Sequence, residues 1–229
     1  MTHHAWGDQP GPAAAGPTSP SPAAGHEAPV GLAVAAGVLA IALTLVQVVY
    51  LVTSIPAARE FEDALRAGRL PDDVLTAYDL VILALAAVAI PTYVVTCLWL
   101  QFARTNSEVI SPGLRHARGK VWVWLGWWVP IVSLWFPFQV VRDVQAASRP
   151  RGAQLGLGLW WTGWVVWLVT NRVTSSMASS TDPEVVADLP VVEGIGTAAL
   201  MLACVQWCRL LQRITADQRT ALAGPTPYR

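Results

Sequence analysis

The sequence predicts an all-α integral membrane protein: a bundle of four to five transmembrane helices with a tryptophan- and proline-rich segment that is kinked or re-entrant. Five apolar stretches fill most of the 229-residue chain, and short charged loops separate them. Charged residues make up 13% of the chain, whereas soluble domains carry roughly 25%. The formal net charge is zero, so no overall basic field favours nucleic acid as a partner.

Both ends of the chain are expected to lie outside the membrane domain, which we assign to residues 30–215. Residues 1–29 are rich in Pro, Ala and Gly, cannot bury enough apolar surface to offset the entropy of ordering, and are expected to be disordered. Residues 216–229 are expected to form a polar C-terminal tail. The spans are expected near residues 30–55, 80–102, 121–141, 155–173 and 189–208.

The first two stretches are long enough to cross a bilayer. A helix over residues 30–55 rises 1.5 Å per residue and exceeds a hydrocarbon core of about 30 Å. We expect Pro56 to end it, and a polar loop with a short surface helix to follow. In the second stretch Pro91 is expected to kink the helix at mid-span, and Trp99 is expected to sit at the membrane interface.

The third stretch, Val121–Val141, has 21 residues with no charge, five tryptophans and two prolines. Pro130 and Pro137 each remove a backbone donor and disfavour helix at the residue before them. The stretch is therefore a kinked span or a re-entrant or interfacial segment. Trp124 and Trp128 share one helical stripe, and an indole is favoured at the interface because its ring is apolar while its N–H stays hydrated.

The last two stretches differ in length. Residues 155–173 are short for a span, and their glycines permit close helix contact; Arg172 is expected to reach the interface with its long side chain. Residues 189–208 have Glu193 near one end and Gln206 near the other. Glu193 is the only carboxylate inside an apolar stretch, four residues past Leu189, and we expect it near the surface.

Positive charge in short loops sets orientation. If all five stretches span, the N-terminus lies outside, with ten basic residues inside and five outside. If the third stretch re-enters, both termini lie inside, with eleven basic residues inside and four outside. The second arrangement also puts the two most acidic loops outside. We therefore expect a multi-pass plasma-membrane protein with cytoplasmic termini, four spans and a re-entrant or interfacial element.

Between Phe102 and Gln145 the chain carries a characteristic pattern. Arg104 and Asn106 follow the second stretch, and a tryptophan–glycine–tryptophan–proline core follows them. That core is Trp124, Gly126, Trp127, Trp128 and Pro130, with Pro137, Arg142, the Trp160/Trp161 pair, Asn171 and Gln212 in step. With these residues the chain resembles the actinobacterial membrane protein family known as domain of unknown function 4328, over roughly residues 30–215. The family usually has Asn where this chain has Ser133, and the resemblance implies an architecture but no assigned activity.

Polar side chains inside apolar stretches are functional candidates by default. They can instead hydrogen-bond between helices, which contributes around 0.6 kcal/mol each, and a substrate or ion path would show more ionisable groups at mid-depth. The candidate structural or functional residues are Arg104, Asn106, Trp124, Gly126, Trp128, Pro130, Ser133, Pro137, Arg142, Asn171, Glu193 and Gln206.

No catalytic, cofactor or metal motif stands out in the sequence. His116 lies beside no plausible nucleophile, and Cys204 and Cys208 have no further ligands nearby. We therefore expect a protein that is not an enzyme, takes no cofactor and binds no nucleic acid. It would act through helix packing and through lipid or protein contacts, with a homo-oligomer also compatible with the pattern.

Four basic residues precede the tryptophan-rich stretch: Arg104, Arg115, Arg118 and Lys120. They are expected to contact anionic lipid headgroups, or to act only as a topology signal; both roles can hold together. The alternative function is a small oligomeric transporter or channel in which the broken segment at Pro130 and Pro137 acts as the gate.

Overall fold

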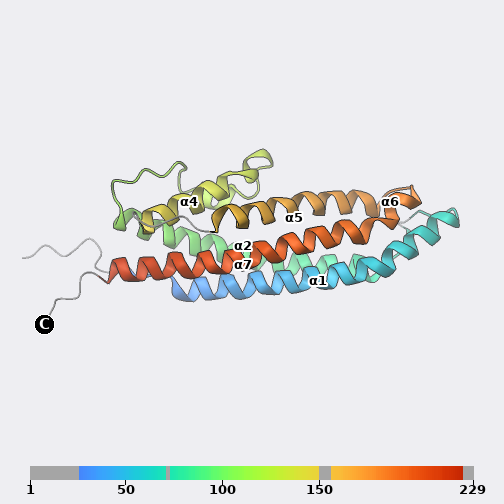
Figure 1. Ribbon diagram of the computed structural model, residues 1–229, viewed down its shortest axis with the longest axis horizontal. Helices are drawn as coiled ribbons and strands as arrows, with labels where there is room; N and C mark the ends of the chain where they lie inside the picture. The colour runs from blue at the N-terminus through green and yellow to red at the C-terminus, as the bar shows by residue number, and fades with distance from the viewer. Residues whose placement is uncertain (1–25, 71–72, 150–155, 224–229) are drawn as a thin grey trace, which may run out of the picture.

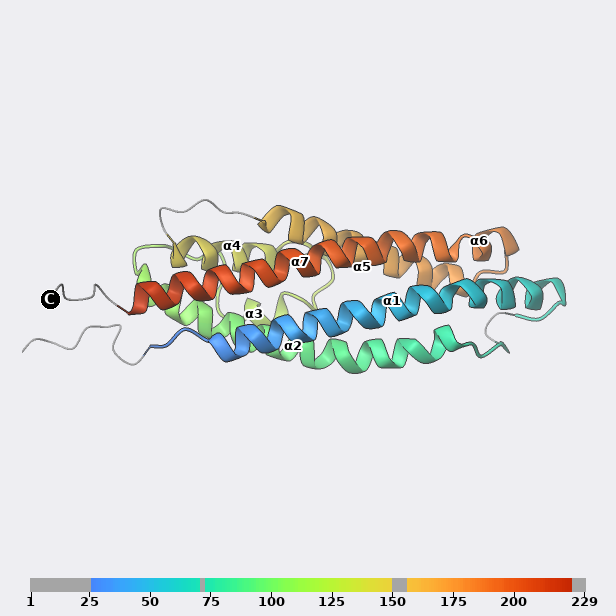
Figure 2. The same cartoon turned by 60° about the horizontal axis from the view of Figure 1, so that its bottom comes forward.

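Four long helices run side by side along the long axis of the molecule, with alternating direction (Figures 1 and 2). A computed structural model describes residues 26–70, 73–149 and 156–223. The expected disordered tail falls mostly on residues 1–25, outside this range. The elements are α1 (Val30–Arg66), α2 (Ala77–Ile110), α3 (Trp122–Leu125), the 3₁₀-helix η2 (Ile131–Leu134), α4 (Phe136–Ser148), α5 (Leu157–Ala178), α6 (Pro183–Ala187) and α7 (Leu189–Leu222). No strand occurs among the described residues.

Three helical segments are long and apolar enough to cross a membrane: α1, α2 and the combined α6–α7 segment. The outer face of α1 carries a stripe of exposed apolar side chains, among them Val34, Val38 and Leu45, each about 60% exposed. An exposed apolar stripe of this kind is unfavourable in water and stable in the hydrocarbon core of a membrane. The protein is therefore a helical membrane protein.

The helix α1 passes through Pro56 instead of ending there, so the expected end at residue 55 is wrong. Hydroxyls supply hydrogen bonds near the proline: Thr53 donates to the Tyr50 carbonyl and Ser54 to the Leu51 carbonyl. Buried side chains such as Phe61 then continue the packed face of the helix. The helix ends at Arg66, and Gly68, whose φ of 72° is left-handed, lets the chain turn back on the last carbonyls.

The C-terminal residues expected to form a polar tail are helical up to Leu222; residues 224–229 lie outside the described range. The reason is Gln218, which is fully buried. Its amide donates to the Ala103 carbonyl (2.6 Å) and to the Ser148 hydroxyl (2.9 Å). A buried polar side chain can pack in a core when its hydrogen bonds are made within the protein. The last turns of α7 therefore stay in the bundle.

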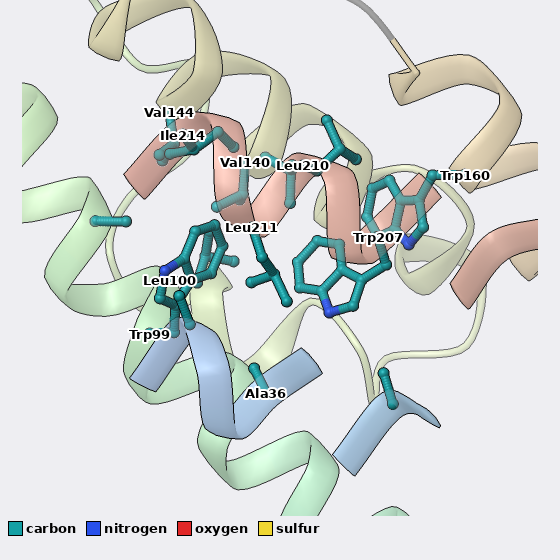
Figure 3. Packing of buried hydrophobic residues seen from close by; sticks show 14 of the residues in the cluster. Ala36, Trp99, Leu100, Val140, Val144, Trp160, Trp207, Leu210, Leu211 and Ile214 are labelled. Atoms are coloured by element: carbon teal, nitrogen blue, oxygen red, sulfur yellow. The ribbon is translucent and has the colours of Figure 1, made fainter. Parts of the chain in front are cut away.

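The main core lies where α1, α2, α4, α5 and α7 meet, and Trp99, Trp160 and Trp207 are among its buried residues (Figure 3). Trp207 of α7 stacks on Trp160 of α5 at 5.0 Å and meets the ring of Trp99 at 84°. Trp99 is fully buried, and its indole donates to the Thr215 hydroxyl. The expectation that Trp99 sits at the membrane interface is therefore wrong, since its N–H finds its partner inside the protein.

Residues 111–149 leave the end of α2 and return to the same end of the bundle, as Figure 1 shows. We name this segment the tryptophan hairpin. Its two arms are joined from base to tip: the Ser111 hydroxyl donates to the Ala147 carbonyl (2.8 Å), and the Trp122 ring packs edge-on against Phe136 (4.7 Å). Between the arms the helix breaks into α3, η2 and α4, because Pro130 and Pro137 remove backbone donors.

Candidate functional site

Two polar clusters stand out in the bundle, one at the base of the tryptophan hairpin and one around Glu193. The hairpin base starts from Arg104, which is 5% exposed. Its Nε lies 3.4 Å from one oxygen of Glu108, whose other oxygen pairs with Lys120 Nζ at 2.7 Å. This chain of charges ties the outgoing arm of the hairpin to α2. Arg104 and Lys120 thus have partners within the protein.

Asn106 joins three further pieces of the chain. Its amide donates to the Glu27 carbonyl (2.9 Å) and to Gln218 Oε1 (3.4 Å). Gln218 in turn bonds to Ser148, the last residue of α4. The returning arm of the hairpin, α2, α7 and the segment before α1 therefore meet at one hydrogen-bonded point.

Asp143 connects the two arms. One of its oxygens accepts from the backbone N–H of Ala117 (2.7 Å), and the other accepts two bonds from Arg142. The ring of His116, the residue before Ala117, has its Nε2 3.3 Å from the Ser107 hydroxyl. Burial, and then the nearby Arg104 charge, lowers the pKa of His116, so its ring is neutral at physiological pH.

The turn of the hairpin depends on Gly126 and Ser133. A Cβ at Gly126 would lie 2.6 Å from the Trp122 carbonyl oxygen, so a larger residue is disfavoured there. The same Cβ would lie 3.7 Å from Pro137, so the two arms are packed here. The Ser133 hydroxyl donates to the Pro130 carbonyl (2.6 Å). The side chain at this position thus closes a turn, a task that Asn also performs well.

Tyr93 of α2 holds the tip of the hairpin against the bundle. Its hydroxyl donates to the Trp124 carbonyl (2.9 Å), and its ring meets Trp124 and Trp128 edge-on. Beyond this contact the tip is apolar and uncovered: Trp128 is 68% exposed and Ile131 is 71% exposed. Other exposed tip residues are Leu125, Val129, Leu134 and Trp135.

Basic side chains lie toward the base of the same hairpin. Arg115 is exposed, and Arg142 keeps 38% of its side chain exposed while it pairs with Asp143. Arg118 donates to Gln139 (2.7 Å) and lies 3.7 Å above the Phe136 ring. The hairpin is thus apolar at its tip and cationic at its base. Gln139 thus bonds within the hairpin.

Glu193 lies inside the bundle and is 2% exposed; the expectation that it sits near the surface is wrong. Tyr78 donates to one carboxyl oxygen (2.8 Å) and Gln47 to the other (3.1 Å). The Trp167 indole donates to the carbonyl oxygen of Gln47 (3.1 Å). Glu193 is buried because α1, α2 and α5 all pack against α7, and its partner Tyr78 belongs to an apolar cluster with Tyr50, Val186 and Leu189.

Asn171 and Gln206 lie apart from this cluster. Asn171 is half-buried on α5, where its backbone carbonyl accepts from the Thr174 hydroxyl. Gln206 is 9% exposed, and its Oε1 would meet a Cβ on Gly156 at 3.0 Å. Nothing in the sequence indicates that Tyr78 bonds to Glu193 or that Trp167 bonds to Gln47. Among the described residues, no three His, Cys, Asp or Glu side chains form a group that could hold a metal ion.

In the comparison with known families, the family described as Domain of unknown function (DUF4328) matches residues 72–216. The matched range contains the tryptophan hairpin, Glu193 and Tyr78, and begins after α1. No curated protein and no solved structure matches the chain.

Proposed function

The chain belongs to the DUF4328 family, and we propose that it is a multi-pass plasma-membrane protein, not an enzyme, that acts through lipid contacts of its tryptophan hairpin. The observation that carries this proposal is the uncovered apolar tip, with Trp128 and Ile131 each about 70% exposed. Exposed apolar surface of this kind is stable in hydrocarbon and unfavourable in water.

In the proposed topology α1, α2, α5 and α7 cross the membrane, and the hairpin enters one leaflet from the side of the termini. The 22 residues of α5 rise about 33 Å, which suffices for a core of about 30 Å. Of the 15 basic residues, eleven then lie on the side of the termini, which is the cytoplasmic side by the positive-inside rule.

The charge along the hairpin supports this placement. With the tip in hydrocarbon, the basic base lies at headgroup level, where each Arg or Lys gains about 1 kcal/mol from anionic lipids. Arg115 and Arg118 are the main headgroup ligands in this proposal, because Arg104 and Lys120 pair with Glu108. The indoles of Trp128 and Trp135 lie deeper, against the acyl chains.

A gate at Pro130 and Pro137 gains no support from their positions. Pro130 is exposed on the hairpin tip, and Pro137 packs against Gly126 of the other arm. Both belong to the tryptophan hairpin, outside the four long helices (Figure 1).

The test uses a photoactivatable amino acid, benzoylphenylalanine, at position 131 of the full chain in its native membrane. The proposal predicts crosslinks to phospholipid, identified by mass spectrometry. The same probe at Val34, on the exposed stripe of α1, is the lipid-facing control. The probe at Leu75, which is 76% exposed in the segment between α1 and α2, is the water-facing control. A single protein adduct at position 131, without lipid, would replace lipid by a protein partner and refute the proposal.

A further inference from the structure

The environment of the Glu193 carboxyl forms a second site, separate from the tryptophan hairpin. Gln47 of α1 and Tyr78 of α2 hydrogen-bond to its carboxyl, and both are neutral. Tyr50 stacks on Tyr78 with 4.1 Å between ring centroids. A further carboxyl, Asp79, lies in the first turn of α2, next to Tyr78 in the chain.

The neighbouring helices offer no counter-charge. From α5 the buried Thr174 faces the site, while the charged residues Arg172 of α5 and Glu184 of α6 are exposed. Among the described residues no Arg, Lys or His forms an ion pair with Glu193. A bare carboxylate inside a membrane bundle is costly. The site therefore needs a bound positive charge, either a metal cation or a proton.

The position of Trp167 decides between a metal cation and a proton as the bound charge. An indole N–H can only donate, so the Gln47 oxygen faces Trp167, and the Gln47 NH₂ faces Glu193 and Thr197. Metal cations such as Na⁺, Ca²⁺ or Mg²⁺ require oxygen ligands. At this site the Gln47 side chain presents its NH₂ group, a donor, to Glu193 instead of its oxygen. Turning the amide to offer its oxygen would break the bond to Trp167. The arrangement fits a proton.

Both protonation states of Glu193 find hydrogen-bond partners. In the ionised state Tyr78 donates to Oε1 and Gln47 donates to Oε2. In the protonated state the Oε1–H donates to the Tyr78 oxygen, the Tyr78 hydroxyl proton turns away from Glu193, and Gln47 keeps its bond to Oε2. Apart from the added proton, the two states differ only in the rotation of the Tyr78 hydroxyl.

Water can reach this end of the bundle. A polar cleft of about 290 Å³ is lined by Asp73, Asp79 and Ser179. Its remaining lining includes Phe61 and Val74, which also pack in the apolar cluster around Tyr78. The cleft thus borders the layer that covers the carboxyl.

We propose that Glu193 is a reversible proton-binding site inside the membrane domain, with Tyr78 as its hydrogen-bond relay toward the cleft at the α6 end of the bundle. On protonation the Tyr78 O–H proton moves to the Glu193 oxygen while the Tyr78 oxygen takes up one proton from water on the cleft side, and on deprotonation both transfers run in reverse, so that Tyr78 is unchanged in either direction. This site is independent of the lipid contacts of the hairpin.

The test is infrared difference spectroscopy of the full chain in lipid nanodiscs, titrated between about pH 5 and pH 9, a range that spans strongly shifted carboxyl groups. The proposal predicts a protonated-carboxyl carbonyl band that appears and disappears with pH. Glu193→Gln removes this band. Glu184→Gln, which removes an exposed carboxyl from α6, leaves it intact.

A second variant, Tyr78→Phe, removes the relay hydroxyl and keeps the ring, and the proposal predicts that it displaces the midpoint of the band. A band that persists in Glu193→Gln would overturn the proposal, as would a wild-type carboxyl that keeps one state throughout the titration. If Glu193→Gln does not fold, the Tyr78→Phe midpoint decides: an unchanged midpoint assigns Glu193 a structural role and overturns the relay.

Discussion

The contact between α5 and α7 makes the sharpest stability prediction, because it passes through Gly163. A Cβ at this position would lie 2.6 Å from the Ala199 carbonyl oxygen and 3.1 Å from the Ala203 nitrogen. Both are backbone atoms of α7, so neither can rotate away. Ordinary contact begins at 3.4 Å, and the two helices would have to separate by about 0.8 Å, a strain of the kind that costs about 1–3 kcal/mol in packed interiors.

The variant Gly163→Ala is therefore expected to lower the free energy of unfolding by about 1–3 kcal/mol. The control is Gly158→Ala on the same helix, where an added Cβ meets nothing within 4 Å; it is expected to be neutral or to stabilise by up to about 1 kcal/mol, since alanine favours helix. Unfolding in mixed micelles with increasing dodecyl sulfate, followed by circular dichroism, measures both. Equal stability of the two variants would refute the close α5–α7 contact.

Three further predictions concern the hairpin and its base. Gln218→Ala, which breaks bonds to Ala103 and Ser148, is expected to cost about 1–3 kcal/mol in the same unfolding assay; the exposed Gln212→Ala is its control, and an equal effect of the two would argue against the junction. Ile131→Asp at the exposed tip is expected to cost up to about 3 kcal/mol in a bilayer and little in detergent, so the comparison of nanodiscs with micelles measures the depth of the tip; no difference between them places the tip in water. Because burial and Arg104 lower the pKa of His116, the unfolded chain binds this proton more readily, and stability is expected to fall as the pH drops below about 6.5; His116→Gln removes that part of the pH dependence, and an unchanged profile would contradict the buried placement.

The sequence predicts the helical membrane class well because that class follows from composition and segment length, which are local properties. The broken third stretch was also predictable, since Pro130 and Pro137 act on the backbone next to them. Helix ends were predicted less well. Pro56 lies inside α1 because hydroxyls and tertiary packing support the helix past it, and neither contribution is visible in a local pattern.

The site around Glu193 was predicted only in part. The carboxylate stands out in the sequence, but its burial depends on the packing of α1, α2 and α5 against α7. Its partners Gln47 and Tyr78, and Trp167, which bonds to Gln47, come from three other helices, more than 25 residues away along the chain. One sequence contains no information on such pairings, and the hairpin base is local only in part, as in the pair of Arg104 and Glu108.

The most direct test of the central claim is the topology of the hairpin in intact cells. In a background where Cys97, Cys204 and Cys208 are replaced by alanine, single cysteines are placed at the exposed positions Gly113 and Arg149, which lie at the two ends of the hairpin. Further single cysteines at the exposed positions Ala67 and Thr181 mark the opposite end of the bundle. A membrane-impermeant thiol reagent is expected to label Ala67 and Thr181 from outside, and Gly113 and Arg149 only after lysis. Labelling of Gly113 and Arg149 from opposite sides would show that residues 121–141 span the membrane, and would contradict the re-entrant hairpin.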